Sequence, residues 1–303
     1  PWLGTFHSIS AKILRKHASA VNLKSNFTII DQDDQVRLVK NICKAENIDV
    51  KKISPKYILA VIDKWKNKGL YPVDVLLKKK ESLEKSFLNI YKIYQQKLID
   101  LNCADFSDLI LHTLKIFQSY KDISTLYSKK FKYILVDEYQ DTNYIQSEWL
   151  RLLSIENNNI CCVGDDDQSI YSWRGAEIKN FLEFDKIYKN TKIIRLEKNY
   201  RSTQNILSVA SKLIENNQNR VGKNLYTNQN EGEFVTLDCF RNVKDEAVEV
   251  SSTIETFKKK YSLNNIAILV RAIFQTREFE ERFLKVGIPY RIIGGIKFYE
   301  RAE

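Results

Sequence analysis

The feature that most constrains the fold is a pair of short apolar runs, each followed at once by polar side chains. The first run covers residues 133–136 and ends in Asp137 and Glu138, and the second covers residues 160–163, shortly before Gln168. Buried parallel strands have this pattern, and open α/β sheets bind ligands at the carboxyl ends of such strands. The sequence therefore predicts two neighbouring parallel strands that bring these three polar side chains to one edge of a sheet.

The chemistry of this edge favours nucleotide hydrolysis. Asp137 can hold Mg²⁺ on a nucleotide, while Glu138 can orient or deprotonate the attacking water. A structural alternative exists, because acidic and amide side chains after a strand are often only a helix N-cap. In that alternative, residues 141–143 cap a helix over residues 143–153.

Further blocks along the chain carry a family resemblance. They are Gly4-Thr5-Phe6-His7-Ser8, residues 104–110, residues 133–143, residues 163–176, residues 196–203 and the tail over residues 268–301. Taken together and in this order, they resemble the motifs of superfamily 1 DNA helicases of the UvrD, Rep and PcrA type.

The resemblance implies an α/β fold with RecA-like parallel-sheet motor domains, of the P-loop NTPase type, and an all-helical insertion subdomain. Residues 1–18 and 105–192 would belong to the first motor domain, residues 19–104 to the helical insertion, and residues 193–303 to the N-terminal part of the second motor domain. A hinge is expected at residues 190–194.

Local patterns predict individual elements. Ser54 and Pro55 form an N-cap and N1 pair for a helix that runs to Lys68, and helical spacing of apolar residues continues from Leu83 to Leu101. After residue 105, strands alternate with helices, which is typical of parallel sheets. The expected strands are 131–136, 160–163, 192–196, 234–240, 265–270 and 289–293, and the expected helices are 109–117, 143–153, 176–184, 202–215 with Ser202 as cap, 244–260 and 275–286.

For the ATP site, the resemblance implies a division of roles. Asp137 would bind Mg²⁺, Glu138 would act on the water, and Gln168 would sense the γ-phosphate. From the second domain, Arg201 would reach the phosphates, because a planar guanidinium suits charge spread over phosphate oxygens. Tyr200 would stack on the adenine. The structural alternatives are an ion pair of Arg201 within its own segment and a core position for Tyr200.

For DNA, the resemblance implies a stacking surface for single strands, which aromatic faces and basic groups grip without base preference. The expected DNA-binding residues are Thr5, His7, Phe106, Tyr171, Trp173, Arg174 and Arg271. A lone Trp is more often packed in a core, and a hydrogen-bonding role within the first domain is an equal alternative for His7. Ile273 stands where the family commonly has Asn or Ser, which puts that DNA contact in doubt.

Composition supports this interpretation without deciding it. The chain has 48 Lys and Arg against 38 Asp and Glu, a formal net charge of +10, which suits a polyanionic partner. We expect single-stranded DNA and duplex junctions as partners, with repair proteins besides, and no membrane. Five cysteines without metal-ligand spacing fit a reducing cytoplasm. With the resemblance, we expect a bacterial cytoplasmic protein associated with the nucleoid. A metal site at Asp165-Asp166-Asp167 is a weak alternative, because the sequence of a calcium loop does not follow.

The sequence contains no Gly-x-x-x-x-Gly-Lys-Ser/Thr loop. We therefore expect an interior piece of a longer protein and no ATP hydrolysis by these 303 residues alone. The resemblance implies that the longer protein is a 3′ to 5′ helicase of DNA repair or replication that uses ATP and Mg²⁺. Two alternatives stay open: the motor part of a helicase–nuclease, and a non-catalytic DNA-binding remnant of a broken gene.

Overall fold

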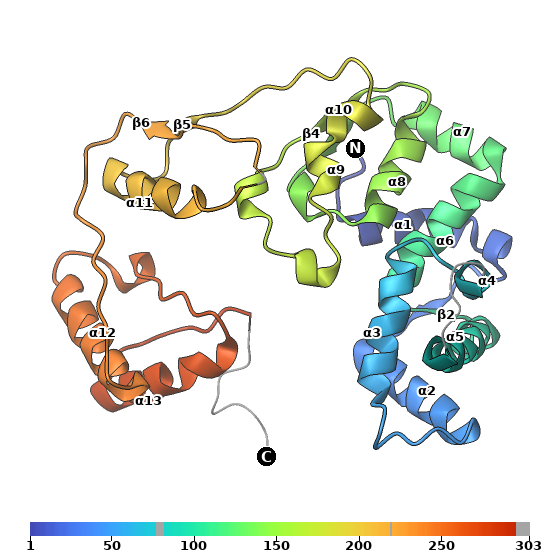
Figure 1. The fold of residues 1–303 in the computed structure, drawn as a ribbon, viewed down its shortest axis with the longest axis horizontal. Coiled ribbons are helices and arrows are strands. Elements are labelled where there is room, and N and C mark those ends of the chain that lie inside the picture. Colours follow the sequence, from blue (N-terminus) through green and yellow to red (C-terminus); the bar gives the residue numbers. More distant parts are fainter. Residues whose placement is uncertain (77–81, 219, 295–303) are drawn as a thin grey trace. The chain divides into compact units, whose positions relative to one another are not determined.

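The computed structural model describes residues 1–76, 82–218 and 220–294, and Figure 1 shows them as a ribbon. The chain divides into two compact units. The first comprises Pro1–Asn199 and Ala210–Tyr226, and the second comprises Tyr200–Val209 and Thr227–Glu303. The end of the tail that carries the family resemblance, residues 295–301, lies outside the described residues.

The first unit is mostly helical. Its elements are α1 (Phe6–Lys16), β1 (Thr28–Ile29), α2 (Gln32–Ala45), α3 (Pro55–Lys66), α4 (Pro72–Leu76), α5 (Ser82–Asp100), β2 (Cys103–Ala104), α6 (Phe106–Ser119), α7 (Lys121–Lys130), β3 (Ile134–Val136), α8 (Tyr144–Ser154), β4 (Ile160–Cys162), α9 (Lys179–Leu182), α10 (Phe184–Ile187) and β5 (Lys198–Asn199). Helix α11 (Gln204–Ile214) and strand β6 (Tyr226–Thr227) each span the division between the units.

Two separate apolar cores stabilise the first unit. One gathers residues of α1, α6, α7, β3 and α8 around Trp149, and the other gathers residues of α2, α3 and α5 around Tyr91. The second core draws its buried residues from positions 39–98, within the range expected for a helical insertion. The sequence boundaries of the predicted domains stay a prediction.

Local sequence signals set the helix starts. Ser54 caps α3 by accepting a hydrogen bond from the Tyr57 amide at 3.2 Å, with Pro55 as the first helical residue, which confirms that prediction. Asn143 caps α8 in a reciprocal capping box with Gln146. The alternative in which polar residues after the strand cap this helix is therefore correct for Asn143. Asp137 and Glu138 take no part in the cap.

Strands β3 and β4 pair in parallel, as the sequence predicts. Ile134 lies opposite Ile160 and Val136 opposite Cys162. Beyond the last pair, the Tyr139 amide donates to the Val163 carbonyl at 3.0 Å, so the two strand ends stay side by side. The prediction that the first strand is buried is wrong for one of its faces, because Leu135 is 81% exposed while Val136 faces the core.

The predicted helix over residues 176–184 is replaced by α9 and α10. The Glu177 amide bonds to the Thr142 carbonyl at 2.9 Å, outside any helix, and Glu183 has the non-helical angles φ −109° and ψ 21° between the two short helices. The hydrogen bond of Glu177 outside the helix and the non-helical backbone of Glu183 therefore leave two short helices in place of one long helix.

The second unit differs more from expectation. Its helices α12 (Val243–Phe257) and α13 (Thr276–Val286) pack against each other around Ile254, Phe279 and Phe283, close to the predicted ranges. Helix α11 begins at Gln204, two residues after its predicted cap Ser202.

Among the described residues, none of the predicted strands at 192–196, 234–240, 265–270 and 289–293 forms. Several of their apolar side chains are exposed, including Leu196, Leu237 and Leu269. A strand needs a paired neighbour as well as an apolar sequence, and these segments have no ladder partner in the part of the chain that is described. Within that part, no helix is long and apolar enough to cross a membrane.

Candidate functional site

The two predicted carboxylates follow β3 and face solvent. Asp137 is the first residue after the strand, and its Oδ1 accepts a hydrogen bond from the Glu138 amide at 3.0 Å. Glu138 adopts a left-handed backbone with φ 51° and ψ 43°, which is uncommon for a residue with a side chain. The sharp turn ends the strand direction and presents both carboxylates at the carboxyl end of the parallel pair.

Gln140 joins this turn to the one that carries Gln168. The Gln140 side chain is 1% exposed; its Nε2 donates to Glu138 Oε2 at 2.7 Å, and its Oε1 accepts from the Asp165 amide at 3.0 Å. Gln168 in turn donates from Nε2 to Asp165 Oδ2 at 2.7 Å. One chain of hydrogen bonds therefore connects Glu138 with Gln168, and sequence reasoning missed Gln140 although it stands two residues after Glu138.

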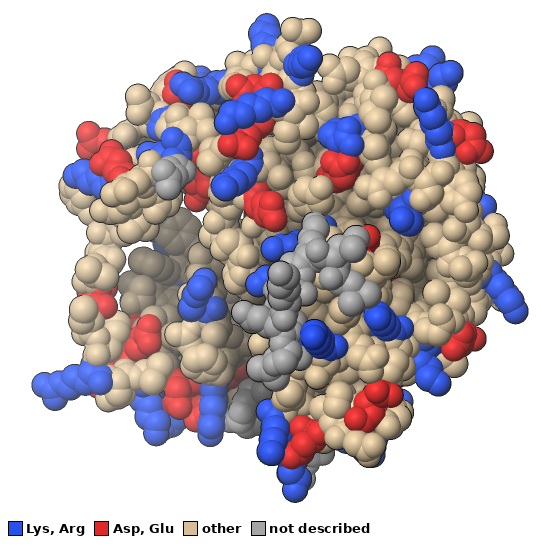
Figure 2. Space-filling view, turned by 45° about the vertical axis from the view of Figure 1, so that its right-hand side comes forward, with Lys and Arg blue, Asp and Glu red and all other residues tan. Residues whose placement is uncertain are grey.

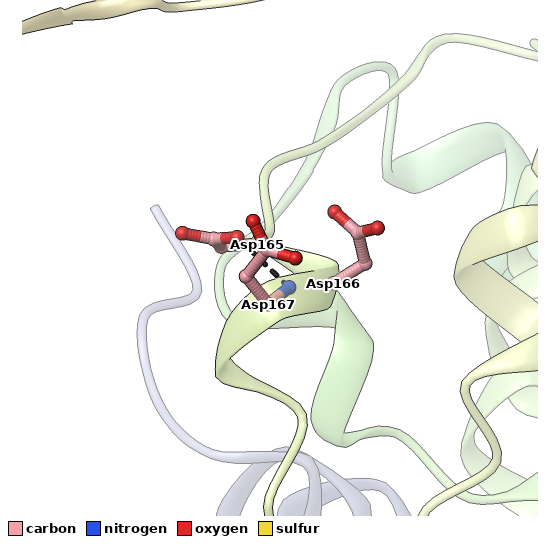
Figure 3. A group of neighbouring side chains, drawn as sticks. All are labelled: Asp165, Asp166 and Asp167. Atoms are coloured by element: carbon pink, nitrogen blue, oxygen red, sulfur yellow. Dashed lines mark hydrogen bonds between the residues drawn. The ribbon is translucent and has the colours of Figure 1, made fainter. Parts of the chain in front are cut away.

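The three aspartates of the second turn lie together, as Figure 3 shows. One carboxylate oxygen from each lies within 4.8 Å of the others. Their oxygens already have partners within the first unit. Arg220 donates to both oxygens of Asp167, at 2.9 and 2.6 Å, and Lys223 pairs with Asp165. Because two cations of the chain itself pair with two of the three carboxylates, and the third accepts from a backbone amide, the geometry favours an internal ion-pair site over a metal site.

Tyr171, Trp173 and Arg174 form an exposed aromatic surface directly after this turn. Trp173 is 72% exposed and Tyr171 is 36% exposed, so the core-packing alternative for Trp173 is wrong. The Arg174 guanidinium lies over both rings, with its carbon 5.1 Å from the Tyr171 centroid and 4.6 Å from that of Trp173. The arrangement offers flat rings with a cation beside them.

His7 and Phe106 form a second aromatic surface. Their rings stack at a centroid distance of 4.2 Å and an angle of 29°, and the Phe106 side chain is exposed. Burial lowers the pKa of His7 to about 4, so its ring is neutral at physiological pH. Thr5 caps α1 by accepting from the Ser8 amide at 3.2 Å, which gives it a structural task besides any contact with DNA.

A cavity of about 440 Å³ adjoins these residues. Thr5, His7 and Asp137 line it together with apolar side chains of α1, β3 and α8, among them Trp149. The structure thus brings together two residues predicted to bind DNA and one predicted to bind Mg²⁺. The first two are more than a hundred residues away from the third in sequence, so their proximity could not be predicted from the sequence.

A buried ionic network holds the helix that presents Phe106. The ammonium group of Lys66, on α3, lies 2.6 Å from Asp105 Oδ2 and 2.7 Å from Asp108 Oδ1, with all three side chains buried. Tyr94, on α5, donates to the same Asp105 oxygen at 2.9 Å. Asp105 and Asp108 form the capping box of α6, so the helical region and the start of α6 are fixed to each other.

The remaining predicted residues belong to the second unit. Tyr200 and Arg201 are both exposed, which excludes the core alternative for Tyr200. Arg271 is exposed as well, and Ile273, the departure from the family pattern, is exposed two residues later. The structure leaves their predicted roles untested.

On the face that Figure 2 shows, the positive charge is not gathered into a single patch. Figure 2 shows Lys and Arg interspersed with Asp and Glu across the face in view. On that face, net charge alone does not mark a DNA-binding groove.

Comparison with known protein families shows the family to which the chain belongs. Residues 1–189 match the model of the UvrD/REP helicase N-terminal domain, and residues 194–303 match that of the UvrD-like helicase C-terminal domain. The chain belongs to the UvrD/REP helicase family. The resemblance stated from the sequence motifs is thereby confirmed.

Individual relatives of this UvrD/REP-family chain agree. A protein of Rickettsia conorii named probable DNA helicase II homolog is 47% identical over 306 residues, covering 99% of this chain and 47% of the relative. DNA helicase II of Escherichia coli is 41% identical over 303 residues, covering the whole chain and 42% of the relative. The ATP-dependent DNA helicase PcrA of Bacillus subtilis is 41% identical over 304 residues, covering the whole chain and 41% of the relative. The chain spans less than half the length of these relatives.

The two UvrD-type matches divide the site residues between them. The N-terminal match contains Asp137, Glu138, Gln168 and both aromatic surfaces, and the C-terminal match contains Tyr200, Arg201 and Arg271. Arg220 and Lys223 also lie in the C-terminal match, yet they bind the aspartates of the N-terminal one.

Proposed function

We propose that this chain is part of an ATP-dependent DNA helicase that moves 3′ to 5′ along single-stranded DNA in repair or replication. The observation that carries the proposal is the hydrogen-bonded edge of β3 and β4, where Glu138 and Gln168 share one network just before Tyr171 and Trp173. The family membership supports RecA-like motor domains around this edge, with the helices of residues 19–104 as an insertion.

The chemistry of the donors fits Mg²⁺ and a nucleoside triphosphate. Asp137 offers an exposed carboxylate at a strand end, the hard oxygen ligand that Mg²⁺ takes in phosphoryl-transfer sites. When bound, the metal neutralises charge that develops on the phosphate oxygens.

Glu138 would orient the attacking water and accept its proton. Its Oε2 accepts from Gln140, which holds the carboxylate of this exposed residue in place. Removing a general base costs typically 10²- to 10⁴-fold in rate.

Gln168 and Arg201 would contact the γ-phosphate from the two motor domains, and Tyr200 would stack on the adenine. The exposure of Tyr200 and Arg201 supports these roles, because both side chains are accessible to a ligand. An arginine supplied from a second domain can stabilise the transition state of phosphoryl transfer through its several donors.

The DNA contacts would come from the two aromatic surfaces. Trp173 and Tyr171 would stack on bases, with Arg174 beside them, and the pair of Phe106 and His7 would extend the track, together with Thr5 and Arg271. Stacking on aromatic side chains tolerates every base, as a translocating motor requires. Since Trp173 follows Gln168 by five residues, strand contact and phosphate sensing would be coupled through one short loop.

Partners and location follow from this activity. We infer that duplex junctions are substrates, that repair proteins are partners, and that the protein acts in the bacterial cytoplasm at the nucleoid.

The test is ATP hydrolysis by the protein as its gene encodes it, with Mg²⁺ and with or without single-stranded DNA. The proposal expects hydrolysis that single-stranded DNA stimulates at least about tenfold, on the scale of a completed catalytic site. DNA binding without any hydrolysis would instead support the non-catalytic remnant.

A further inference from the structure

A four-residue segment between α11 and β6 binds the turn that carries Gln168 through ion pairs and a hydrogen bond. Arg220 binds Asp167, the Val221 amide donates to Asp166 Oδ2 at 2.7 Å, and Lys223 binds Asp165. Residues 220–223, called the latch here, thus contact all three aspartates of the turn, and Asp167 is contacted twice because Lys223 Nζ also lies 3.7 Å from its Oδ2. Both sides of these contacts lie in the first compact unit.

The latch contacts are stronger than ordinary surface ion pairs. Arg220 makes a two-pronged pair, and its side chain and that of Asp167 are only 19% and 12% exposed. The exposed pair of Lys186 and Glu183, by contrast, has exposures of 70% and 50%. A bidentate, partly desolvated guanidinium–carboxylate pair is held more firmly and is screened less by salt.

The contacts continue from the latch to both proposed hydrolysis residues. Lys223 binds the carboxylate of Asp165, whose other oxygen accepts from Gln168. The amide of Asp165 donates to Gln140, and Gln140 donates to Glu138. A displacement of the latch would therefore free Asp165, and Asp165 is the residue through which both Gln168 and Glu138 are held in position.

Resting on the proposed function, we propose that Arg220 and Lys223 are positioning residues for ATP hydrolysis: they hold Asp167 and Asp165 so that Gln168 and Glu138 are presented in register. The two cations lie in the part of the chain that matches the C-terminal family domain, and the aspartates in the part that matches the N-terminal one. Hydrolysis thereby depends on the segment that follows Tyr200 and Arg201 being in place.

The experiment measures kcat and KM for ATP with Mg²⁺ and saturating oligo(dT), using the protein as its gene encodes it. Arg220→Gln and Lys223→Gln should each lower kcat about 10- to 100-fold, the scale on which small misplacements of catalytic groups act. KM for ATP should change less than about threefold, because a displaced turn impairs the transition state more than nucleotide binding.

Three further variants separate positioning from a loss of folding. Arg151→Gln removes a matched bidentate pair with Glu148 on α8 and should leave kcat unchanged. Lys223→Arg keeps the charge and should retain most of the activity. Asp167→Asn combined with Arg220→Gln should cost less than the sum of the two single changes, because both changes break the same bidentate pair.

Two results would overturn the inference while leaving the proposed function intact. In the first, the latch variants keep the kcat of the wild type. In the second, they lose activity only in proportion to a fall in Tm, and Arg151→Gln shows the same fall. A wild-type protein without any ATP hydrolysis would overturn the proposed function itself, and the latch as a positioning device with it.

Discussion

Glu138 combines an exposed carboxylate with a left-handed backbone, a conformation that costs a residue with a side chain roughly 1–2 kcal/mol. Structures keep such local strain where the surroundings fix it, often at functional sites. Here Gln140 supplies that fixation through its bond to the carboxylate.

Glu138→Gln tests the role of this carboxylate in the protein as its gene encodes it. The amide keeps an oxygen that can accept from Gln140 but cannot take a proton from water, so we expect ATP turnover to fall at least about 10²-fold. Asp137→Asn should lower turnover similarly. Nucleotide binding, measured by equilibrium titration, should persist, and near-normal DNA-stimulated turnover in Glu138→Gln would refute the assignment.

Trp173→Ala tests the stacking surface. Because the ring is exposed, its removal should weaken binding of single-stranded DNA by roughly 1–3 kcal/mol without unfolding the protein. Fluorescence anisotropy with oligo(dT) and urea unfolding measure the two effects. Tyr57→Ala, which removes an exposed aromatic ring from α3, is the control and should bind normally. Equal affinities of Trp173→Ala and the control would argue against stacking.

At the scale of elements, the local helix starts and the parallel pairing of β3 with β4 could be predicted, whereas the strands expected at 192–196, 234–240, 265–270 and 289–293 do not form among the described residues. Ser54 and Asn143 cap their helices through partners three residues away, so the signal is local. The expected strand at 234–240 would need a hydrogen-bonded partner strand that is distant in sequence, and an apolar sequence alone does not specify that partner. The Lys66 network escaped prediction for the same reason, since its carboxylates lie 39 and 42 residues away in sequence.

The junction of α3 and α6 should respond to pH through Asp63. Burial, with the nearby Asp105 carboxylate, raises the pKa of Asp63 to about 6 in the folded protein, from an ordinary 3.8. Between these two values the unfolded chain binds fewer protons, so the stability that Asp63 contributes at acidic pH is lost as pH rises towards 6.

Asp63→Asn removes this titration while keeping an oxygen that can accept from Ser107. Relative to the wild type, it should therefore gain roughly 1–2 kcal/mol in the free energy of unfolding at pH 7 and nothing near pH 4, allowing for partial exposure. Urea unfolding at both pH values measures the difference, with Asp100→Asn on α5 as an exposed control. An equal gain at both pH values would contradict the account.

At the scale of the whole molecule, the ordered motifs predicted the family, and the two family matches confirmed it. The excess of positive charge, by contrast, did not predict where DNA would bind, because acidic and basic side chains alternate over the surface in view (Figure 2). The latch also lay beyond prediction, since Arg220 and Asp167 are 53 residues apart. Motifs identify functional side chains that are close together in sequence. The contacts that hold those side chains in position come from residues far away in sequence.

The most direct test of the central claim is strand displacement from tailed DNA duplexes, with ATP and Mg²⁺, by the protein as its gene encodes it. The account predicts displacement from duplexes with a 3′ single-stranded tail, little from those with a 5′ tail, and none with Glu138→Gln. Displacement only from 5′-tailed duplexes would contradict the proposed direction. Tight DNA binding without ATP-dependent displacement would contradict the helicase itself.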